Sequence, residues 1–413
     1  MALVTHRGVY LPSLKKPASG RPIEEMTVLS RAYLPVALRG ETRPVLSRYT
    51  SVLQGQVIAR PVKSEGVPLL SSVSGVYTEE KTLSHPIYGE IDCLVMDCME
   101  IRRPTPPAPQ STDKLTPAQI LDIARQQAVI DELDGRFVAE KLQEWAAEGC
   151  DILVGDGVED QPYACAAWGV LNESVEQVYE GLKLAARALG VEEYHLSVQP
   201  LPGDHRRALR QRLGDDKKLF IVRGKYPAQC YTKKPFGKTV RRIGVQALLA
   251  LWRAAALGEP HTTCVVTVAG DAVATPRNLR VPFGTPATEL FRLCGLAADP
   301  TLLLFGDMMT GRAVSDPDTP VLPGVTCLLA LCQPDRPVDG VCVGCGRCVQ
   351  VCHVGLMPEA ILQLCEKGAT DQLAPLHPEG CDGCGACSAV CPAGRELALT
   401  IFNITREEGG ETP

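Results

Sequence analysis

The sequence predicts a multidomain α/β and α+β protein that ends in a cysteine-rich domain. Its 413 residues suffice for two to four domains of ordinary size. Three observations lead to this fold class. Short β-prone runs fill the first hundred residues, helical and strand patterns alternate in the middle of the chain, and half of the 18 cysteines fall between Cys342 and Cys391.

Residues 1–102 are predicted to form an all-β unit, a small barrel or sandwich suited to docking. The runs 56–59, 69–77 and 91–99 are rich in β-branched and aromatic residues and are separated by Gly, Pro and Ser. The proline-rich stretch Arg103–Pro109 reads as the linker that follows this unit, because proline interrupts both helices and sheets.

Residues 113–262 are predicted to form an α/β unit with a parallel sheet, because strand and helix patterns alternate along them. Thr116, Pro117 and Gln119 have the pattern of a capping box with proline in the first helical turn. The predicted strands are 151–155, 194–198 and 219–223, and the predicted helices are 174–189, 204–213 and 238–257.

Residues 263–332 return to a mixed α+β pattern, with a strand at 264–268 and a helix near 287–294. A second proline-rich linker, Gln333–Gly340, leads into the cysteine-rich domain at 338–401. Residues 402–413 are expected to form a tail.

Composition narrows the class of function and the location. The net charge of −6 is mild and does not favour nucleic acid or an anionic membrane surface as a partner. No apolar stretch approaches the roughly 20 residues of a spanning helix, so we expect no direct membrane insertion. Met1–Pro12 lacks the apolar segment of an export signal. The cysteines therefore predict metal ligation in the cytoplasm, in a protein that is soluble or peripheral at the inner face of the membrane.

Two cysteine runs carry the most specific signal. Residues 342–352 read CVGCGRCVQVC and residues 381–391 read CDGCGACSAVC, and each run has the spacing C-x2-C-x2-C-x3-C of [4Fe–4S] ferredoxins. The first three cysteines of a run wrap one cluster, whereas the fourth ligates the other cluster. The predicted ligands of cluster 1 are Cys342, Cys345, Cys348 and Cys391, and those of cluster 2 are Cys352, Cys381, Cys384 and Cys387. Structural zinc is disfavoured, since zinc sites use paired C-x2-C knuckles.

Residues around these runs refine the prediction. Glycines at 344, 346, 383 and 385 allow backbone N–H groups to approach cluster sulfur. Pro392 follows the second run as the ferredoxin pattern requires, whereas His353 takes the place of proline after the first. We interpret His353 as a neighbouring or surface residue outside the ligand set. The cysteines elsewhere lack ligand spacing, and most are expected to be buried, inert thiols.

Taken together, several segments resemble the RnfC-like electron-transport family, which includes a branch associated with proline reductase. The N-terminal HRGVYLP, the motifs GQVIA at 55–59 and SSVSG at 71–75, the segment 268–286 and the two cysteine runs carry the resemblance. The resemblance implies a barrel-sandwich domain at 1–102, a Rossmann-like FMN- and NADH-binding domain at 113–262, an SLBB β-grasp unit at 263–332 and a ferredoxin-like domain at 338–401.

The middle domain departs from the family where flavin and NADH would bind. The family's glycine-rich loop corresponds here to Asp131–Leu142, which keeps only Gly135 and Phe137. Several glycines are needed for backbone N–H groups to reach a phosphate, and the acidic side chains here would repel it. Gly157, Glu159 and Lys225 match the remaining family motifs and form the candidate cofactor site. Two interpretations stay open: FMN and NADH still bind there, or the domain is a scaffold.

Three functional hypotheses follow. In the first, the chain relays electrons through two [4Fe–4S] clusters, from a donor flavoprotein or ferredoxin to an acceptor reductase, without its own NADH or flavin site. In the second, it is an RnfC-type NADH:acceptor oxidoreductase subunit that binds FMN in a membrane-associated complex. In the third, it is a non-redox adaptor, which two complete cysteine runs disfavour. In the first two, it is an electron-transfer subunit with protein redox partners, and no catalytic residue is predicted.

Overall fold

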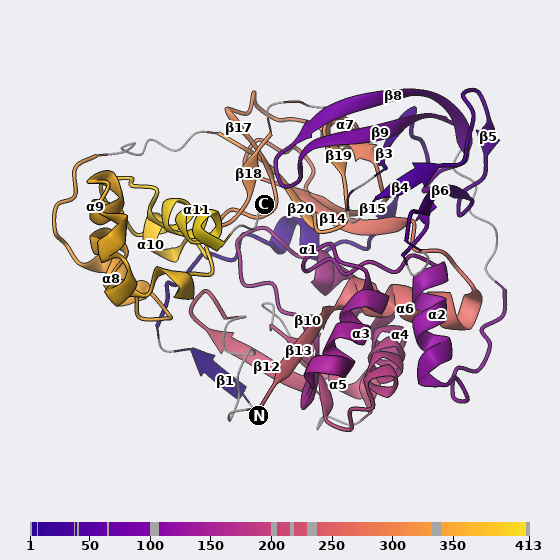
Figure 1. Cartoon of the computed structure of the whole chain (residues 1–413), viewed down its shortest axis with the longest axis horizontal. Coiled ribbons are helices and arrows are strands. Elements are labelled where there is room, and N and C mark those ends of the chain that lie inside the picture. The colour runs from indigo at the N-terminus through magenta and orange to yellow at the C-terminus, as the bar shows by residue number, and fades with distance from the viewer. Residues whose placement is uncertain are drawn as a thin grey trace.

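The computed structural model describes residues 2–409, apart from 6, 37, 39–40, 64–65, 100–106, 200–204, 215–218, 229–237, 315, 317 and 333–339. Both predicted linkers therefore lie largely outside the described residues. Figure 1 shows the α/β unit below, two β-rich units above it, and the cysteine-rich helices at one side.

A five-stranded parallel sheet forms the centre of the α/β unit, as the alternating pattern predicts. Its strands in spatial order are β1 (Ala2–Thr5), β12 (Leu219–Gly224), β11 (Tyr194–Val198), β10 (Ile152–Gly157) and β13 (Val240–Gly244). Its helices are α2 (Pro117–Gln126), α3 (Val138–Glu148), α4 (Ala166–Leu189), α5 (His205–Leu213) and α6 (Val245–Leu257). The edge strand β1 comes from the segment predicted as all-β, so residues 2–5 of that segment belong to the sheet of the α/β unit.

Two helix predictions in this unit need correction. The helix predicted over 238–257 is wrong in its first part, because residues 240–244 form β13 beside β10 and only then does α6 begin. The helix predicted from Ser174 begins earlier, within α4, although Ser174 itself breaks the helical backbone with φ −135° and ψ 33°. The capping box at Thr116 and Gln119 is confirmed, and Gly190 ends α4 in the left-handed conformation.

Helices α4 and α6 pack closely because one residue lacks a side chain. A Cβ atom on Gly181 of α4 would lie 1.9 Å from the carbonyl oxygen of Leu248 in α6. Around this contact lies the largest apolar core, which includes the fully buried Leu153, Leu171 and Leu196.

The N-terminal β unit has two antiparallel sheets. One sheet orders β3 (Arg31–Pro35), β9 (Gly89–Cys98), β8 (Gly75–His85) and β5 (Ser51–Val52), and the other orders β4 (Thr42–Pro44), β6 (Val57–Pro61) and β7 (Leu69–Leu70). This is the sandwich that the β-prone runs predict. The short helix α1 (Lys16–Ser19) precedes it.

The next unit has β-grasp topology, because its hairpin strands flank a parallel central pair, β14 and β20. Its sheet orders β18 (Arg312–Ala313), β17 (Leu302–Phe305), β20 (Cys327–Leu331), β14 (Thr263–Ala269), β15 (Arg277–Pro282) and β2 (Glu24–Glu25), with α7 at Ala287–Cys294 and the small pair β16 (Thr285–Pro286) and β19 (Pro320–Val321). The strand predicted at 264–268 and the helix at 287–294 are confirmed. Assignment to the SLBB family stays a prediction.

The cysteine-rich unit is built from short helices. They are α8 (Arg347–Val351), α9 (Pro358–Glu366), α10 (Ala386–Ala389) and α11 (Leu397–Gly409), with 3-10 turns at 370–372, 374–376 and 378–380. The segment expected to be a tail, 402–413, is helical in its described part, because α11 continues to Gly409, and Ile401 just before it is buried in one cluster with Leu356 and Ile361. Among the described residues, no helix has the length and apolarity needed to cross a membrane.

Candidate functional site

The four cysteines predicted for cluster 1 line one cavity of about 260 Å³. Cys342, Cys345 and Cys348 come from the loop that leads into α8 and from its first turn, and Cys391 comes from the end of the second run. The fourth cysteine therefore crosses to the cavity of the other run, as the ferredoxin spacing implies.

The four cysteines predicted for cluster 2 form a more buried set. Cys352 and Cys381 pack against the same apolar residues, and Cys387 is 8 % exposed. Burial, with contributions from the neighbouring Cys381 and Cys352, raises the pKa of Cys387 to about 12, and burial also raises the pKa of Cys384. Thiolates become stable in such a place when a metal cation lies beside them, and this donor chemistry fits an iron–sulfur cluster.

The backbone loops of the two cysteine runs have the same conformation, with left-handed glycines at equivalent positions. Gly344 and Gly346 have φ of 68° and 69°, and their counterparts Gly383 and Gly385 have 70° and 77°. The two runs thus repeat one left-handed loop conformation, which residues with a Cβ rarely adopt. The backbone N of Gly344 lies 3.4 Å from Cys342 Sγ and donates to it, so this loop amide points at the sulfur of a predicted ligand.

The cluster 2 loop docks on two neighbouring units, whereas the cluster 1 cavity lies near the molecular edge. The Tyr226 hydroxyl, just after β12, donates a hydrogen bond to the carbonyl oxygen of Cys384. Gly385 packs against the Met309 carbonyl in the loop between β17 and β18. Cys345 of the other set is exposed, and Val343 beside it is 70 % exposed. In Figure 1, α8 and α9 form the outer edge, and α10 and α11 lie inward.

His353 lies beside the cluster 2 set. Its side chain is 5 % exposed, its Nε2 is 3.0 Å from Asp382 Oδ2, and these two groups and Cys384 Sγ lie within 4.8 Å of one another. The interpretation of His353 as a neighbour of the ligands fits this position, and a surface position does not. The sequence analysis did not single out Asp382, although it directly follows the predicted ligand Cys381.

The candidate cofactor residues Gly157 and Lys225 have separate structural environments. A Cβ on Gly157 would lie 2.6 Å from Leu171 Cδ1, so this glycine allows close packing of β10 on α4. Lys225 places its Nζ 5.4 Å from the ring centroid of the exposed Tyr10. Contacts within the protein thus account for both residues.

The third candidate, Glu159, caps helix α4 with its carboxylate. Its two oxygens accept hydrogen bonds from the N–H groups of Ala167 and Trp168, each at 3.0 Å. Burial raises the pKa of Glu159, and the nearby Lys15 ammonium opposes this shift. Lys15 also donates to the Glu159 carbonyl oxygen. A carboxylate at a helix N-terminus compensates the unpaired amides there, which explains Glu159 without a cofactor.

The loop that corresponds to the family's glycine-rich loop is a tight turn in which several backbone amides already donate hydrogen bonds. The N–H of Asp131 donates to the Arg136 carbonyl at 2.8 Å, and that of Gly135 donates to the Asp131 carbonyl at 2.8 Å. The N–H groups of Leu133 and Arg136 donate to aspartate side chains of the same loop. A phosphate at this loop would have to displace these bonds.

Acidic side chains from this turn also occupy the start of α6. Glu132 accepts from the N–H groups of Gln246 and Ala247 at 2.6 and 2.9 Å, and Asp131 accepts from Gly244 at 3.0 Å. The chain order reverses between β10 and β13, and ligands of open α/β sheets bind at such switch points. The sequence indicated repulsion of phosphate by these acids, but did not show that they occupy a helix N-terminus.

Replacing Glu132 should change how stability depends on pH. Burial, together with the nearby Asp131, raises the pKa of Glu132 in the folded protein. As pH rises, the Glu132 carboxyl group therefore loses its proton at a lower pH in the unfolded chain than in the folded one. The wild type should therefore lose stability relative to Glu132→Gln as pH rises. The loss should begin near pH 4.3, the ordinary pKa of glutamate, and end at the raised pKa, with a slope of at most about 1.4 kcal/mol per pH unit. Anaerobic urea unfolding of both proteins across this range would measure the difference. A difference between the two proteins that stays constant with pH would contradict the assignment.

Most other described cysteines are buried thiols, as predicted. Burial raises the pKa values of Cys93, Cys98, Cys165 and Cys264 to about 12 and that of Cys294 to about 11. Cys230 lies outside the described residues.

Comparison with known proteins agrees with this architecture. A family model described as a 4Fe-4S dicluster domain matches residues 341–395, and one described as the RnfC barrel sandwich hybrid domain matches residues 3–100. The chain is thus an iron–sulfur electron-transfer protein, and its dicluster domain indicates two [4Fe–4S] clusters. The barrel-sandwich match relates it to the RnfC family.

Three curated relatives illustrate the similarity. A subunit of the ion-translocating oxidoreductase complex of Rhodobacter capsulatus is 27 % identical over 85 % of this chain and 73 % of the relative. A subunit of the proton-translocating ferredoxin:NAD(+) oxidoreductase complex of Clostridium ljungdahlii is 24 % identical over 87 % of this chain and 84 % of the relative. The ion-translocating complex of Pseudomonas aeruginosa has a subunit that is 28 % identical over 86 % of this chain and 49 % of the relative, so this chain spans about half of that protein.

Among solved structures, an NAD+-reducing [NiFe]-hydrogenase in the H2-reduced state aligns with a TM-score of 0.45 and 16 % identity, over 72 % of this chain and 67 % of that one.

Proposed function

We propose that the chain is the RnfC-type subunit of an ion-translocating oxidoreductase complex, peripheral to the membrane on its cytoplasmic side. The observation that carries this proposal is the pair of four-cysteine sets, one docked on the α/β unit and one near the molecular edge. When bound, [4Fe–4S] clusters supply one-electron carriers. Cys342, Cys345, Cys348 and Cys391 would hold one cluster, and Cys352, Cys381, Cys384 and Cys387 the other.

The relatives support the complex-bound form of this function. Their names describe subunits of ion- or proton-translocating oxidoreductase complexes, and one of these complexes acts between ferredoxin and NAD+. By this similarity, the chain exchanges electrons with protein partners of such a complex, and its α/β unit is the part that would take FMN and NADH. The contribution of its own residues is to position the cluster 2 loop against that unit through Tyr226 and against the β-grasp unit through Met309.

A second candidate is a relay that lacks a nucleotide site and serves a soluble reductase, such as the proline-reductase-associated branch of the family. The hydrogen bonds of the 131–136 turn, and the Glu132 carboxylate at the start of α6, favour it. A non-redox adaptor has less support, because it would need neither set of thiol ligands.

An anaerobic NADH titration of the purified, FMN-supplemented protein separates the two candidates. Under the complex-bound proposal, NADH gives the electron paramagnetic resonance signals of reduced clusters, and dithionite gives no larger signal. Reduction by dithionite or reduced ferredoxin, but not by NADH, would contradict an NADH-oxidising subunit and leave the relay. The same preparation should bind FMN in equilibrium dialysis if the first outcome holds.

A further inference from the structure

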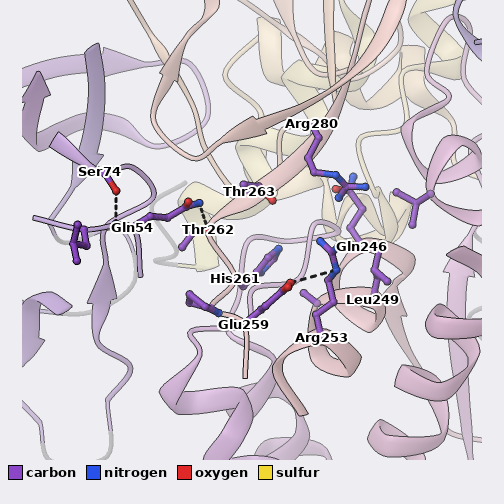
Figure 2. Close-up of a pocket in the computed structure, with 14 residues that line it drawn as sticks. Gln54, Ser74, Gln246, Leu249, Arg253, Glu259, His261, Thr262, Thr263 and Arg280 are labelled. Carbon is purple, nitrogen blue, oxygen red and sulfur yellow. Dashed lines mark hydrogen bonds and ion pairs between the residues drawn. The ribbon is translucent and has the colours of Figure 1, made fainter. Parts of the chain in front are cut away.

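A second pocket lies away from the cysteines, where the sandwich, the α/β unit and the β-grasp unit meet. It has a volume of about 400 Å³, within the range of small-molecule sites. Its walls come from the sandwich residues Leu53, Gln54 and Ser74, from α4 and α6, from the connection between α6 and β14, and from β15 (Figure 2). Ligand sites favour such interfaces between structural units.

One side of the pocket is apolar and belongs to a packed core. Val170, Leu249 and Ala250, here called the apolar wall, are 1 %, 5 % and 7 % exposed and belong to the core of the α/β unit. The Gln246 side chain beside them is fully engaged, because its amide group exchanges hydrogen bonds with the backbone of Val265 at 2.9 and 2.7 Å. An apolar ligand group placed here would meet a preformed surface.

Two arginines face the same space. Figure 2 shows Arg253 extending from α6 and Arg280 extending from β15 toward one another. Burial, and to a smaller extent the charges of both arginines, lower the pKa of His261 to about 4, so this wall residue is neutral near pH 7. Two guanidinium groups that face one cavity repel each other, and an anion placed between them would reduce this repulsion.

Arg253 and Arg280 each pair with a glutamate, and these pairs leave N–H donors of both guanidinium groups for a ligand. Arg253 Nε lies 3.5 Å from Glu259 Oε2, a loose ion pair longer than an ordinary hydrogen bond. Arg280 uses its Nε toward Glu25 at 2.9 Å, and a guanidinium group has five N–H donors. Because Glu259 and Glu25 already offset part of the positive charge of Arg253 and Arg280, the site suits a monoanion better than a doubly charged phosphate.

We propose that this pocket binds a small organic carboxylate, with its carboxylate group between Arg253 and Arg280 and its apolar body against the apolar wall. The planar, bidentate donors of arginine match a carboxylate. The proposal goes beyond electron transfer and does not depend on it, because the pocket contains none of the cluster ligands.

Isothermal titration of the cluster-loaded protein with benzoate tests the proposal. Benzoate joins a carboxylate to an apolar ring, benzyl alcohol is a matched probe without charge, and inorganic phosphate tests the alternative anion. We expect saturable binding of benzoate and none of benzyl alcohol. Arg253→Gln and Arg280→Gln should each weaken benzoate binding by at least about tenfold, since each removes a charged donor.

The control is Arg292→Gln on α7, an exposed arginine paired with Glu289 and outside the pocket. It should bind benzoate like the wild type. The iron content of every variant is measured in parallel, so a folding failure is separated from a loss of binding. The proposal is overturned if benzoate does not saturate the wild type, if only phosphate binds, or if the Arg253 and Arg280 variants with full iron content bind benzoate as well as the wild type.

Discussion

Cys391→Ala should remove the cluster held by the first cysteine run, although Cys391 belongs to the second. Cys391 lines the same cavity as Cys342, Cys345 and Cys348, so its loss leaves three ligands there and all four in the other set. The anaerobically purified variant should contain about four iron atoms per chain instead of about eight. Iron analysis and electron paramagnetic resonance would measure the loss.

Double variants identify which set Cys391 serves. Combined with Cys345→Ala, Cys391→Ala should cost no further iron, because both changes affect one site. Combined with Cys384→Ala, it should leave almost no iron. The reverse pattern would show that each run holds its own cluster. Cys365→Ala on α9 is the matched control: it removes a half-buried thiol of the same domain outside both sets, and the iron content should stay at about eight.

The cysteine centre could be predicted from the sequence because its geometry is local. Within each run, spacing and left-handed glycines determine which thiols face one cavity. When the two runs pack together, the fourth cysteine of one run reaches the cavity of the other run, as the repeated spacing already implies. The residues that pack against the cysteine centre from other units could not be predicted in this way. Tyr226 and Met309 reach it from other units, and nothing near them in the sequence signals this contact.

In the α/β unit, contacts between distant segments also explain why two sequence-based predictions differ from the structure. Residues 240–244 continue the apolar and basic pattern of the following helix, but hydrogen bonding to β10 makes them a strand. Asp131 and Glu132 look like surface acids in a turn, whereas Asp131 is buried, Glu132 is half-buried, and both accept hydrogen bonds from the start of α6. In both cases a tertiary partner, distant in the sequence, overrides the local preference.

The contact between the cluster 2 loop and the β17–β18 loop leads to a second strong prediction. A Cβ on Gly385 would lie 2.4 Å from the Met309 carbonyl oxygen, and its φ of 77° disfavours any side chain. Gly385→Ala should therefore displace the loop that carries Cys384. We expect the variant to lose about half of its iron on purification, or to release iron to a chelator at least about tenfold faster than the wild type.

The repeat supplies a matched control for this substitution. Gly346 occupies the same position in the first run with φ 69°, but its Cβ would meet no atom within 4 Å among the described residues. Gly346→Ala thus adds the same left-handed strain, about 1–2 kcal/mol, without the clash. If both variants lose iron equally, backbone strain alone explains the loss. If only Gly385→Ala loses it, docking on Met309 holds the inner cluster site in place, and the two runs differ in how strongly the rest of the protein supports them.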